Sequence, residues 1–243
     1  TVPEFLELRF DRRSRLYVSA LTLFSNIVVD TAGTLFAGAM VIQVFFPETD
    51  LVVACLGLAL VAGLYTAAGG LAAVVYTDVL QAIVLLFGSC LVAYFSFGQL
   101  DFSWASIVAN TAPEKLSLML PLDDPNLPWL GTLVGVPILG FYFWCTNQFI
   151  VQRVLGARNI AHARWGALLA GLLMLAVLYL MVFPGVMAAI FLPDLDNGDR
   201  VFPTLVATLL PAGLAGIVFA GMLAAIMSCI DSTLNSASTL LTM

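Results

Sequence analysis

The chain has 243 residues, of which 61% are hydrophobic and only 10% are charged, and its formal net charge is −6 at pH 7. A mean hydropathy of +1.04 is typical of a polytopic membrane protein and excludes an ordinary soluble domain. The nine Lys and Arg residues form no surface for nucleic acid, so we expect the lipid bilayer as a partner and no nucleic acid. The sequence opens at Thr1 and stops at Met243 within a polar segment, and we therefore expect a fragment of a longer protein.

Six apolar segments are long enough to cross a bilayer, which takes about 20 residues. They cover about 15–46, 51–68, 71–98, 129–152, 165–192 and 212–242. We therefore predict an all-α, polytopic membrane bundle and treat residues 1–243 as one partial transmembrane domain. The four cysteines lie in apolar stretches without metal-ligand spacing, so neither a disulfide framework nor a zinc site is indicated.

The positive charges predict the orientation. Seven of the nine Lys and Arg residues lie at the start of the chain or between the fourth and fifth segments: Arg9, Arg12, Arg13, Arg15, Arg153, Arg158 and Arg164. By the positive-inside rule, residues 1–14 and 153–164 are cytoplasmic. The connections 47–50, 99–128 and 193–211 are then outside, and we expect the plasma (inner) membrane.

Shorter features fall between and within the spans. Residues 66–70 predict a tight turn between the second and third spans. Residues 102–112 predict a short interfacial helix with Phe102, Trp104 and Ile107 facing the headgroups. Residues 201–210 predict an external helix folded over the mouth of the bundle.

The fourth span contains Gly135-Val136-Pro137-Ile138-Leu139-Gly140, which we expect to interrupt its hydrogen-bond ladder. Broken helices at membrane depth line a cavity or pack on protein. The run Tyr142, Phe143 and Trp144 follows this sequence; core packing is the default for it, and a substrate platform or gate is the alternative.

The last span carries a polar stripe. On a helix of 3.6 residues per turn one face holds Ala225, Ser228, Cys229, Ser232, Asn235 and Ser236, with Asp231 beside Ser228. An Asp at a membrane-helix centre costs roughly 2.5–3.5 kcal/mol, and a small cation is the simplest means of neutralising it.

Three acids lie within spans, Asp30, Asp78 and Asp231, and we expect no embedded Lys or Arg to pair with them. One alternative is that hydroxyls or backbone satisfy each acid, or that each is protonated. The other is that they serve a cation. Hydroxyl and carbonyl oxygens suit Na⁺, so Ser228, Ser232 and the carbonyl of Ala225 are candidate sodium ligands.

Four stretches together resemble the sodium/solute symporter family, which includes the sodium/glucose cotransporters. They are Pro3–Phe10, Tyr65–Gln81, Trp144–Arg153 and Met222–Leu240, and the resemblance covers almost the whole chain. It implies a leucine-transporter-like fold of two inverted five-helix repeats, of which this chain would hold core helices three to eight.

The resemblance also implies the site residues. A conserved sodium site would use Ala225, Ser228 and Cys229 together with a first helix that lies outside this chain, and Cys229 departs from the usual Ser or Thr. A second sodium would use Asp78 with Ser228, Asp231 and Ser232. For substrate we expect a cavity formed by a further set: Asp30, Gly140, Phe143, Trp144 and Asn147.

Sugar-carrying relatives place Asn, Tyr and Lys where this chain has Gly140, Phe143 and Met174, which argues against glucose or galactose. A carboxylate at Asp30 favours a cationic or polyhydroxylated ligand. The predicted function is sodium-coupled symport of a small polar solute by alternating access, with Na⁺ as the coupling ion. The oligomeric state is not indicated.

Three alternatives remain. A proton-coupled carrier is the nearest, and a membrane sensor joined to a signalling module is another. An intramembrane protease would use Asp78 and Asp231 as a dyad, but neither acid has the Gly-x-Gly-Asp signature, and the only histidine, His162, is expected in the cytoplasm. We therefore predict that the protein is not an enzyme.

Overall fold

The computed structural model describes residues 1–125, 127–195 and 197–242, with the side chains of 70–73 left aside. These residues form helices joined by short loops, and their only β-type pairing is a single bridge between Leu120 and Pro128. Six helical segments are long and apolar enough to cross a membrane. The predicted all-α class and the number of spans are confirmed.

The first span, Arg12–Phe45, has three parts. Helix α1 (Val2–Arg9) precedes it; α2 (Arg12–Phe24) then passes into a π-helical segment, η1 (Ser25–Thr31), and continues as α3 (Ala32–Phe45). A π segment widens the helix locally and leaves some carbonyls without their usual partners, which is why such segments occur at functional sites. This one contains Asp30.

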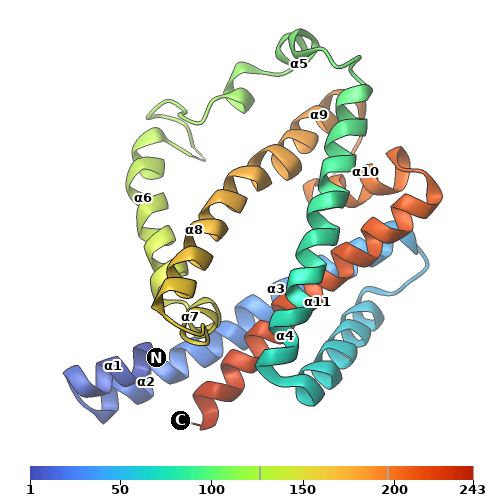
Figure 1. Ribbon diagram of the computed structural model, residues 1–243. Helices are drawn as coiled ribbons and strands as arrows, with labels where there is room; N and C mark the ends of the chain where they lie inside the picture. Colours follow the sequence, from blue (N-terminus) through green and yellow to red (C-terminus); the bar gives the residue numbers. More distant parts are fainter. Residues whose placement is uncertain (126, 196, 243) are drawn as a thin grey trace.

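Helix α4 (Leu51–Gly98) supplies the second and third spans, Leu51–Gly69 and Val74–Gly98. Figure 1 shows the chain reversing between these two arms at the lower end of the bundle. Near the reversal Tyr65 and Thr77 form a hydrogen bond between the arms. The tight turn expected at 66–70 is not found in residues 66–69, which are still helical.

The fourth span is broken, but not where the sequence predicts. Helix α6 (Trp129–Phe141) runs through Pro137, and the π-helical segment η3 (Tyr142–Thr146) follows it. The break comes at Asn147, whose backbone is extended and whose side chain accepts a hydrogen bond from Phe149 N (3.2 Å) to begin α7 (Gln148–Leu155). The expected break at 135–140 is wrong because a proline costs one hydrogen bond, whereas Asn147 provides a cap for a new helix.

The fifth span, Ile160–Phe191, consists of α8 (Ile160–Val177), the π-helical η4 (Leu178–Val182) and α9 (Phe183–Phe191). It starts earlier than the predicted 165–192. Asn159 caps α8 by accepting a hydrogen bond from His162 N at 2.9 Å, so the helix begins within the basic segment.

Short helices cover the opposite end of the bundle: α5 (Trp104–Asn110), the 3₁₀ turns η2 (Pro113–Leu116) and η5 (Gly198–Arg200), and α10 (Val201–Leu209). A helix is confirmed at the expected 201–210, and its external position stays a prediction. Within α5, Trp104 is exposed as expected, but Ile107 is 1% exposed and packs inward, so its predicted headgroup contact is wrong.

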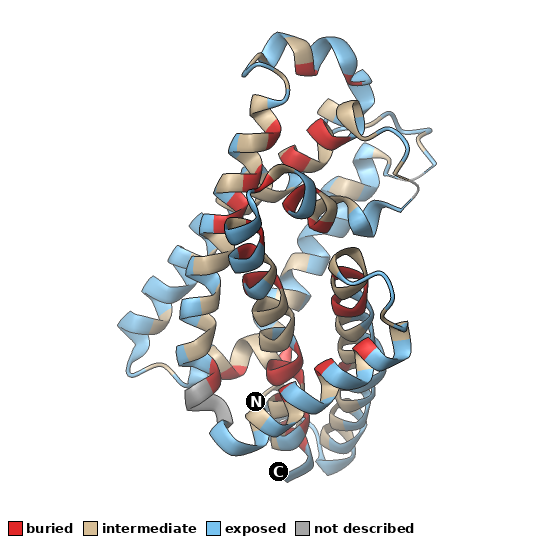
Figure 2. Ribbon diagram, turned by 90° about the vertical axis from the view of Figure 1, so that its right-hand side faces the viewer, coloured by how far each residue is buried: buried red, intermediate tan, exposed pale blue. Residues whose placement is uncertain are grey.

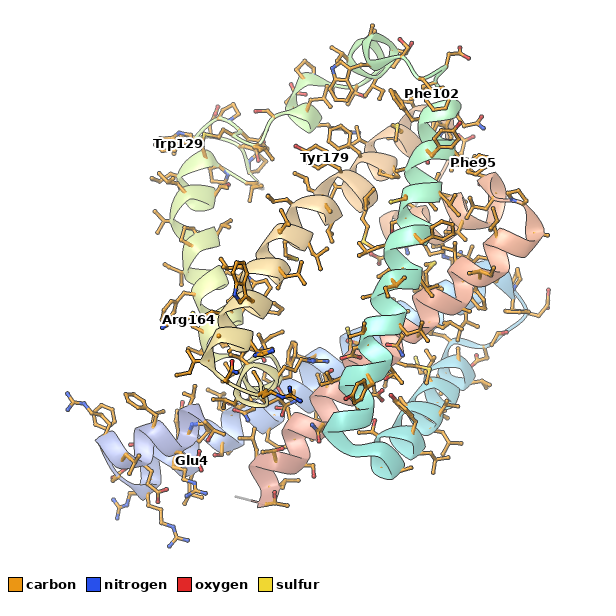
Figure 3. All side chains as sticks on the ribbon, in the orientation of Figure 1. Glu4, Phe95, Phe102, Trp129, Arg164 and Tyr179 are labelled. Carbon is orange, nitrogen blue, oxygen red and sulfur yellow. The ribbon has the colours of Figure 1, made fainter. Side chains whose placement is uncertain are left out.

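Aromatic rings gather at this end. Figure 3 shows Phe95 and Phe102 near the top of α4 and Tyr179 on the upper part of the fifth span. Phe102 lies 5.3 Å from Phe97, and Trp104 lies 5.6 Å from Phe183, between ring centroids. Such a collection of rings is typical of a membrane interface.

Helix α11 (Ala212–Thr242) forms the sixth span and the centre of the core, where it packs mainly on α4 and also on α3 and η1. A Cβ added at Gly88 would lie 2.8 Å from both methyl groups of Val218, and one at Gly221 would lie 2.7 Å from Val84 Cγ1. Glycine therefore sets the close approach of α4 and α11.

Figure 2 shows buried positions gathered along the central helices and exposed positions on the outer ones. No residue in the apolar windows of the fourth and fifth spans is buried among the described residues. The arm formed by α6, α7 and α8 thus leaves wide apolar surfaces without protein cover, which suits contact with lipid.

Candidate functional site

Helix α11 presents polar side chains to three different elements near its middle. Ser228 and Ser232 face the second arm of α4 and α7. Asp231 faces the first arm of α4, whereas Thr233 and Ser236 face the first span. The polar stripe of the sequence is therefore divided among several neighbours in the fold.

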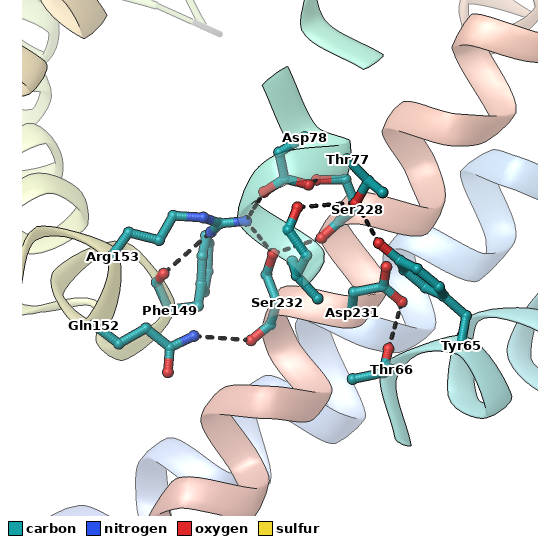
Figure 4. A network of polar contacts seen from close by, with 11 residues as sticks. Tyr65, Thr66, Thr77, Asp78, Phe149, Gln152, Arg153, Ser228, Asp231 and Ser232 are labelled. Atoms are coloured by element: carbon teal, nitrogen blue, oxygen red, sulfur yellow. Dashed lines mark hydrogen bonds and ion pairs between the residues drawn. The ribbon is translucent and has the colours of Figure 1, made fainter. Parts of the chain in front are cut away.

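The charged part of this site, which we term the Asp78 cluster, consists of Asp78, Arg153, Ser228 and Ser232 (Figure 4). Arg153 Nη2 donates to Asp78 Oδ2 at 2.7 Å and also to Ser232 Oγ. Ser228 Oγ donates to Asp78 Oδ1, and Ser232 Oγ donates to the Ser228 carbonyl at 2.5 Å. Three helices, α4, α7 and α11, thus meet at one carboxylate.

The Asp78 cluster corrects the expectation that no basic residue pairs with the acids of the spans. Arg153 lies on α7, beyond the break at Asn147, and its side chain extends back to Asp78; the two side chains are 27% and 21% exposed. From the sequence alone, the charge of Arg153 predicts a loop position for it. The buried residues Gln148 and Gln152 mark a polar helical face beside it, a spacing of four that could have revealed the extra turn.

Asp231 is fully buried. Its Oδ1 accepts a hydrogen bond from Thr66 Oγ1 at 2.6 Å, but Oδ2 has no hydrogen-bond partner among the described residues. An oxygen buried in this way requires a proton, a cation or water to satisfy it. At the next residue of α11, the carbonyl of Ser232 accepts a hydrogen bond from Gln152 Nε2 at 3.4 Å, so Asp231 has polar neighbours.

A second, uncharged set of contacts joins α11 to the first span, and we term it the neutral clip: Asn26, Thr31, Thr233 and Ser236. Asn26 Nδ2 donates to Ser236 Oγ at 2.8 Å, and the hydroxyls of Thr31 and Thr233 lie 2.9 Å apart. The side chains of Asn26 and Ser236 are almost completely buried. Apart from the placement of Ser236 on the stripe, sequence reasoning missed this set.

The structure places Ala225, Ser228 and Cys229 within one turn of α11. Ala225 borders a cavity of about 530 Å³ between α3, α4, α10 and α11. Ser228 is engaged with Asp78, and Cys229 is exposed. The three predicted ligands therefore lie close together on α11. Of the three, Ser228 is the one that forms a hydrogen bond to a charged side chain among the described residues, that of Asp78.

The five predicted substrate residues lie in two regions. Asp30 lies half-buried in η1, where its carbonyl accepts a hydrogen bond from Thr34 Oγ1 at 2.7 Å. The other four, Gly140, Phe143, Trp144 and Asn147, lie around the end of the fourth span. No hydrogen bond within the described part of the chain joins Asp30 to them.

The second region has an aromatic wall. Phe143 and Trp144 are in edge-to-face contact at 5.4 Å, and Trp144 borders a cavity of about 540 Å³ that is also lined by Arg153 and His162. A Cβ added at Gly140 would meet nothing within 4 Å. Asn147 has a structural role as the cap of α7, in addition to any contact with a ligand.

The described fold and the Asp78 cluster define a polytopic membrane protein with a polar site inside its helix bundle. A family model extends this conclusion: the chain belongs to the sodium:solute symporter family, whose model matches residues 1–243. The family predicted from the four sequence stretches is thereby confirmed.

Individual relatives agree. Sodium/myo-inositol cotransporter 2 of Mus musculus is 38% identical over 278 residues, covering 100% of this chain and 41% of the relative. Sodium/glucose cotransporter 4 of Danio rerio is 34% identical, covering 100% of this chain and 42% of the relative. The chain thus spans less than half the length of these relatives.

A solved structure of a Na⁺-coupled sialic acid symporter, in a substrate-bound outward-open state, has a similar fold. It superposes with a TM-score of 0.76 at 23% identity, covering 98% of this chain and 52% of that chain. This similarity concerns the fold alone and confirms the leucine-transporter-like helical class.

Proposed function

We propose that the full-length protein carrying this chain is a sodium-coupled symporter that brings a small polar solute into the cell by alternating access. The observation that carries the proposal is the Asp78 cluster. A carboxylate and two hydroxyls from α4 and α11 converge inside the bundle of a chain that belongs to the sodium:solute symporter family. Hard oxygen ligands of this kind suit Na⁺.

Two sodium sites follow from the residues. The first would use Ala225, Ser228 and Cys229, with the remaining ligands supplied by protein outside this chain. The second would use Asp78 and Asp231 with the hydroxyls of Ser228 and Ser232. The unpartnered Oδ2 of Asp231 supports the second site, because a cation would satisfy it.

The orientation belongs to the same proposal. Residues 1–14 and 153–164 would face the cytoplasm, and the protein would lie in the plasma (inner) membrane. The aromatic rings around Phe102 and Trp104 would then lie at the outer interface. The interior of the cell is negative, so each sodium ion that enters across a potential of about −100 mV moves down the electrical gradient. It supplies about 2.3 kcal/mol, which is enough for more than tenfold accumulation of solute.

The proposed solute is polyhydroxylated. Two observations support this class: the half-buried carboxylate of Asp30 can accept hydroxyl hydrogens, and the chain is similar to transporters described as sodium/myo-inositol cotransporters. Gly140 and Phe143 lack the polar groups expected for glucose or galactose recognition. We therefore place cyclic polyols ahead of hexoses as candidate substrates.

Uptake into proteoliposomes tests the proposal. The purified full-length protein should accumulate labelled myo-inositol, or another polyol found in a competition screen, when sodium is high outside. Replacing sodium by choline should abolish accumulation at constant pH. Equal accumulation in choline would refute sodium coupling and favour the proton-coupled alternative if a proton gradient then drove uptake.

The sensor alternative makes a different prediction. A sensor would bind the solute with sodium-dependent affinity but would not move it into the vesicle. Equilibrium binding without accumulation, in vesicles shown to be tight, would therefore exclude the transporter proposal. An enzyme is not proposed, because the named relatives are cotransporters.

A further inference from the structure

Arg153 already occupies the place that a second sodium ion would take. Its Nη2 contacts Asp78 Oδ2 at 2.7 Å and Ser232 Oγ, two of the oxygens assigned above to that ion. Figure 4 shows the guanidinium between α7 and the other two helices, with Asp78 on one side and Ser232 on the other. One positive charge therefore neutralises Asp78 without any metal.

A guanidinium and a sodium ion compete for these oxygens. Both would be cations within a few ångströms of each other in a partly buried site, where like charges repel strongly. Each oxygen of Asp78 already accepts one hydrogen bond, Oδ1 from Ser228 and Oδ2 from Arg153, so only part of its capacity remains for an ion. A sodium ion that binds Asp78 Oδ2 and Ser232 Oγ takes the two oxygens that Arg153 Nη2 contacts, and it therefore competes with Arg153.

Two features of the structure would allow the Arg153 side chain to move away from Asp78. It lies on α7, which is separated from α6 and η3 by the break at Asn147. A second contact within α7, from Nη1 to the carbonyl of Phe149 at 3.2 Å, moves with that helix. Arg153 also borders the cavity of about 540 Å³ beside Trp144 and His162, which offers room for the released side chain.

We propose that Arg153 is a tethered competitor of sodium: its guanidinium holds the Asp78 site when the ion is absent, and sodium binding there releases α7 from α11. Arg153 is then a positioning residue that links occupancy of the ion site to movement of the helix after the break. This inference rests on the proposed function, since it concerns the same second sodium site.

Linkage makes the competition measurable. If Arg153 weakens sodium binding, removing its charge must strengthen sodium binding by the same coupling factor, and such factors are typically about 5- to 150-fold. A structural ion pair predicts the reverse, since losing it would loosen the site and weaken binding. The direction of the change therefore separates the two roles.

The test is equilibrium binding of radioactive sodium to the purified full-length protein without solute. Arg153→Gln should lower the half-saturating sodium concentration of the second site by at least about fivefold. Arg153→Lys keeps the charge and should remain close to the unmodified protein. The matched control is Arg164→Gln: Arg164 is exposed on α8 and has no ion pair among the described residues, and Figure 3 labels it on that helix.

Hydrogen exchange gives an independent readout. Saturating sodium should speed amide exchange in α7 of the unmodified protein, because the Arg153 contact to α11 is lost and the weaker Gln152 contact to the Ser232 carbonyl is left. In Arg153→Gln the exchange of α7 should be fast with or without sodium. Exchange of α7 that does not respond to sodium in the unmodified protein would overturn the proposal.

Two binding outcomes would also overturn it. One is weaker sodium binding in Arg153→Gln. The other is unchanged binding in Arg153→Gln; if Asp231→Asn then loses binding, the ion lies on the free oxygen of Asp231 beside an undisturbed Arg153. Either result would overturn the role of Arg153 while the unmodified protein still showed sodium-driven uptake. If the unmodified protein showed no sodium-dependent uptake at all, the proposed function would be refuted instead.

Discussion

The neutral clip and the Asp78 cluster both join α11 to its neighbours through polar side chains, but they differ in charge and in the elements they connect. The neutral clip uses an amide and hydroxyls to hold α11 to the first span. The Asp78 cluster uses an ion pair to hold α11 and α4 to α7, a short helix that follows a break. Neutral buried contacts rigidify a scaffold, whereas a charged contact can exchange one cation for another.

The comparison teaches which polar residues of a membrane helix to regard as functional. Ser236 and Ser232 are one helical turn apart on α11 and equally buried. What distinguishes them is the partner, since Ser236 contacts Asn26 and Ser232 contacts Arg153. Four variants can break or sharpen this contrast.

The largest effect on transport is expected at Asp78. Asp78→Asn should raise the sodium concentration for half-maximal uptake by about tenfold or more, a loss of about 1.4 kcal/mol, because the site loses its charged ligand. Uptake into proteoliposomes at varied sodium measures it. The exposed loop residue Asp123 provides the control variant, Asp123→Asn.

This variant also leaves Arg153 without its carboxylate, so the double variant Asp78→Asn/Arg153→Gln is needed beside it. An unpaired Arg153 would lower the expression of Asp78→Asn, and the double variant removes that unpaired charge. If the double variant is expressed normally but still lacks sodium activation, Asp78 is an ion ligand. Unchanged sodium activation in both variants would remove Asp78 from the coupling role.

A second variant tests the rigid side of the comparison. Gly88→Ala would bring a methyl group to 2.8 Å from both methyls of Val218, a β-branched side chain that cannot rotate away easily. We expect overpacking to destabilise the protein by about 1–3 kcal/mol. Thermal unfolding in detergent measures this, with Gly57→Ala as the control in the same helix, where the added methyl meets nothing within 4 Å. Equal unfolding temperatures for the two variants would contradict the close packing of α4 on α11.

Ser236→Ala tests the neutral clip. It leaves the buried amide of Asn26 without its partner and should cost about 1–3 kcal/mol of stability, while sodium activation stays unchanged. The exposed Ser238 supplies the control Ser238→Ala. A marked change in sodium activation without loss of stability would show that the neutral clip belongs to the ion site.

The smallest effect is expected at Cys229. Cys229→Ser replaces a soft thiol by a hard hydroxyl oxygen and should lower the half-saturating sodium concentration a few-fold. Cys90→Ser, at another exposed cysteine, is the control. Sodium activation that is the same in Cys229→Ser and in the unmodified protein would argue that position 229 does not ligate the ion.

The spans could be predicted from the sequence because length and hydropathy are local properties of each segment. The break in the fourth span could not, because proline and glycine mark weak points but the capping side chain of Asn147 decides where the new helix begins. The same limit applies to Ile107, whose burial depends on contacts beyond its own helix.

The site was predicted in part. A stripe of hydroxyls with Asp231 on α11 is visible at helical spacing, and the family resemblance adds Asp78. The pairing of Arg153 with Asp78 and of Asn26 with Ser236 joins residues 75 and 210 positions apart, which no local pattern encodes. Whether a basic residue after a span lies in a loop or turns back into the site depends on the helix that carries it.

The most direct measurement is the number of sodium ions bound at saturation by the full-length protein, with Asp78→Asn and Ser236→Ala compared in the same assay. The account predicts that Asp78→Asn binds fewer ions or binds them much more weakly, and that Ser236→Ala binds as the unmodified protein does. Full sodium binding by Asp78→Asn, or loss of binding in Ser236→Ala alone, would contradict it.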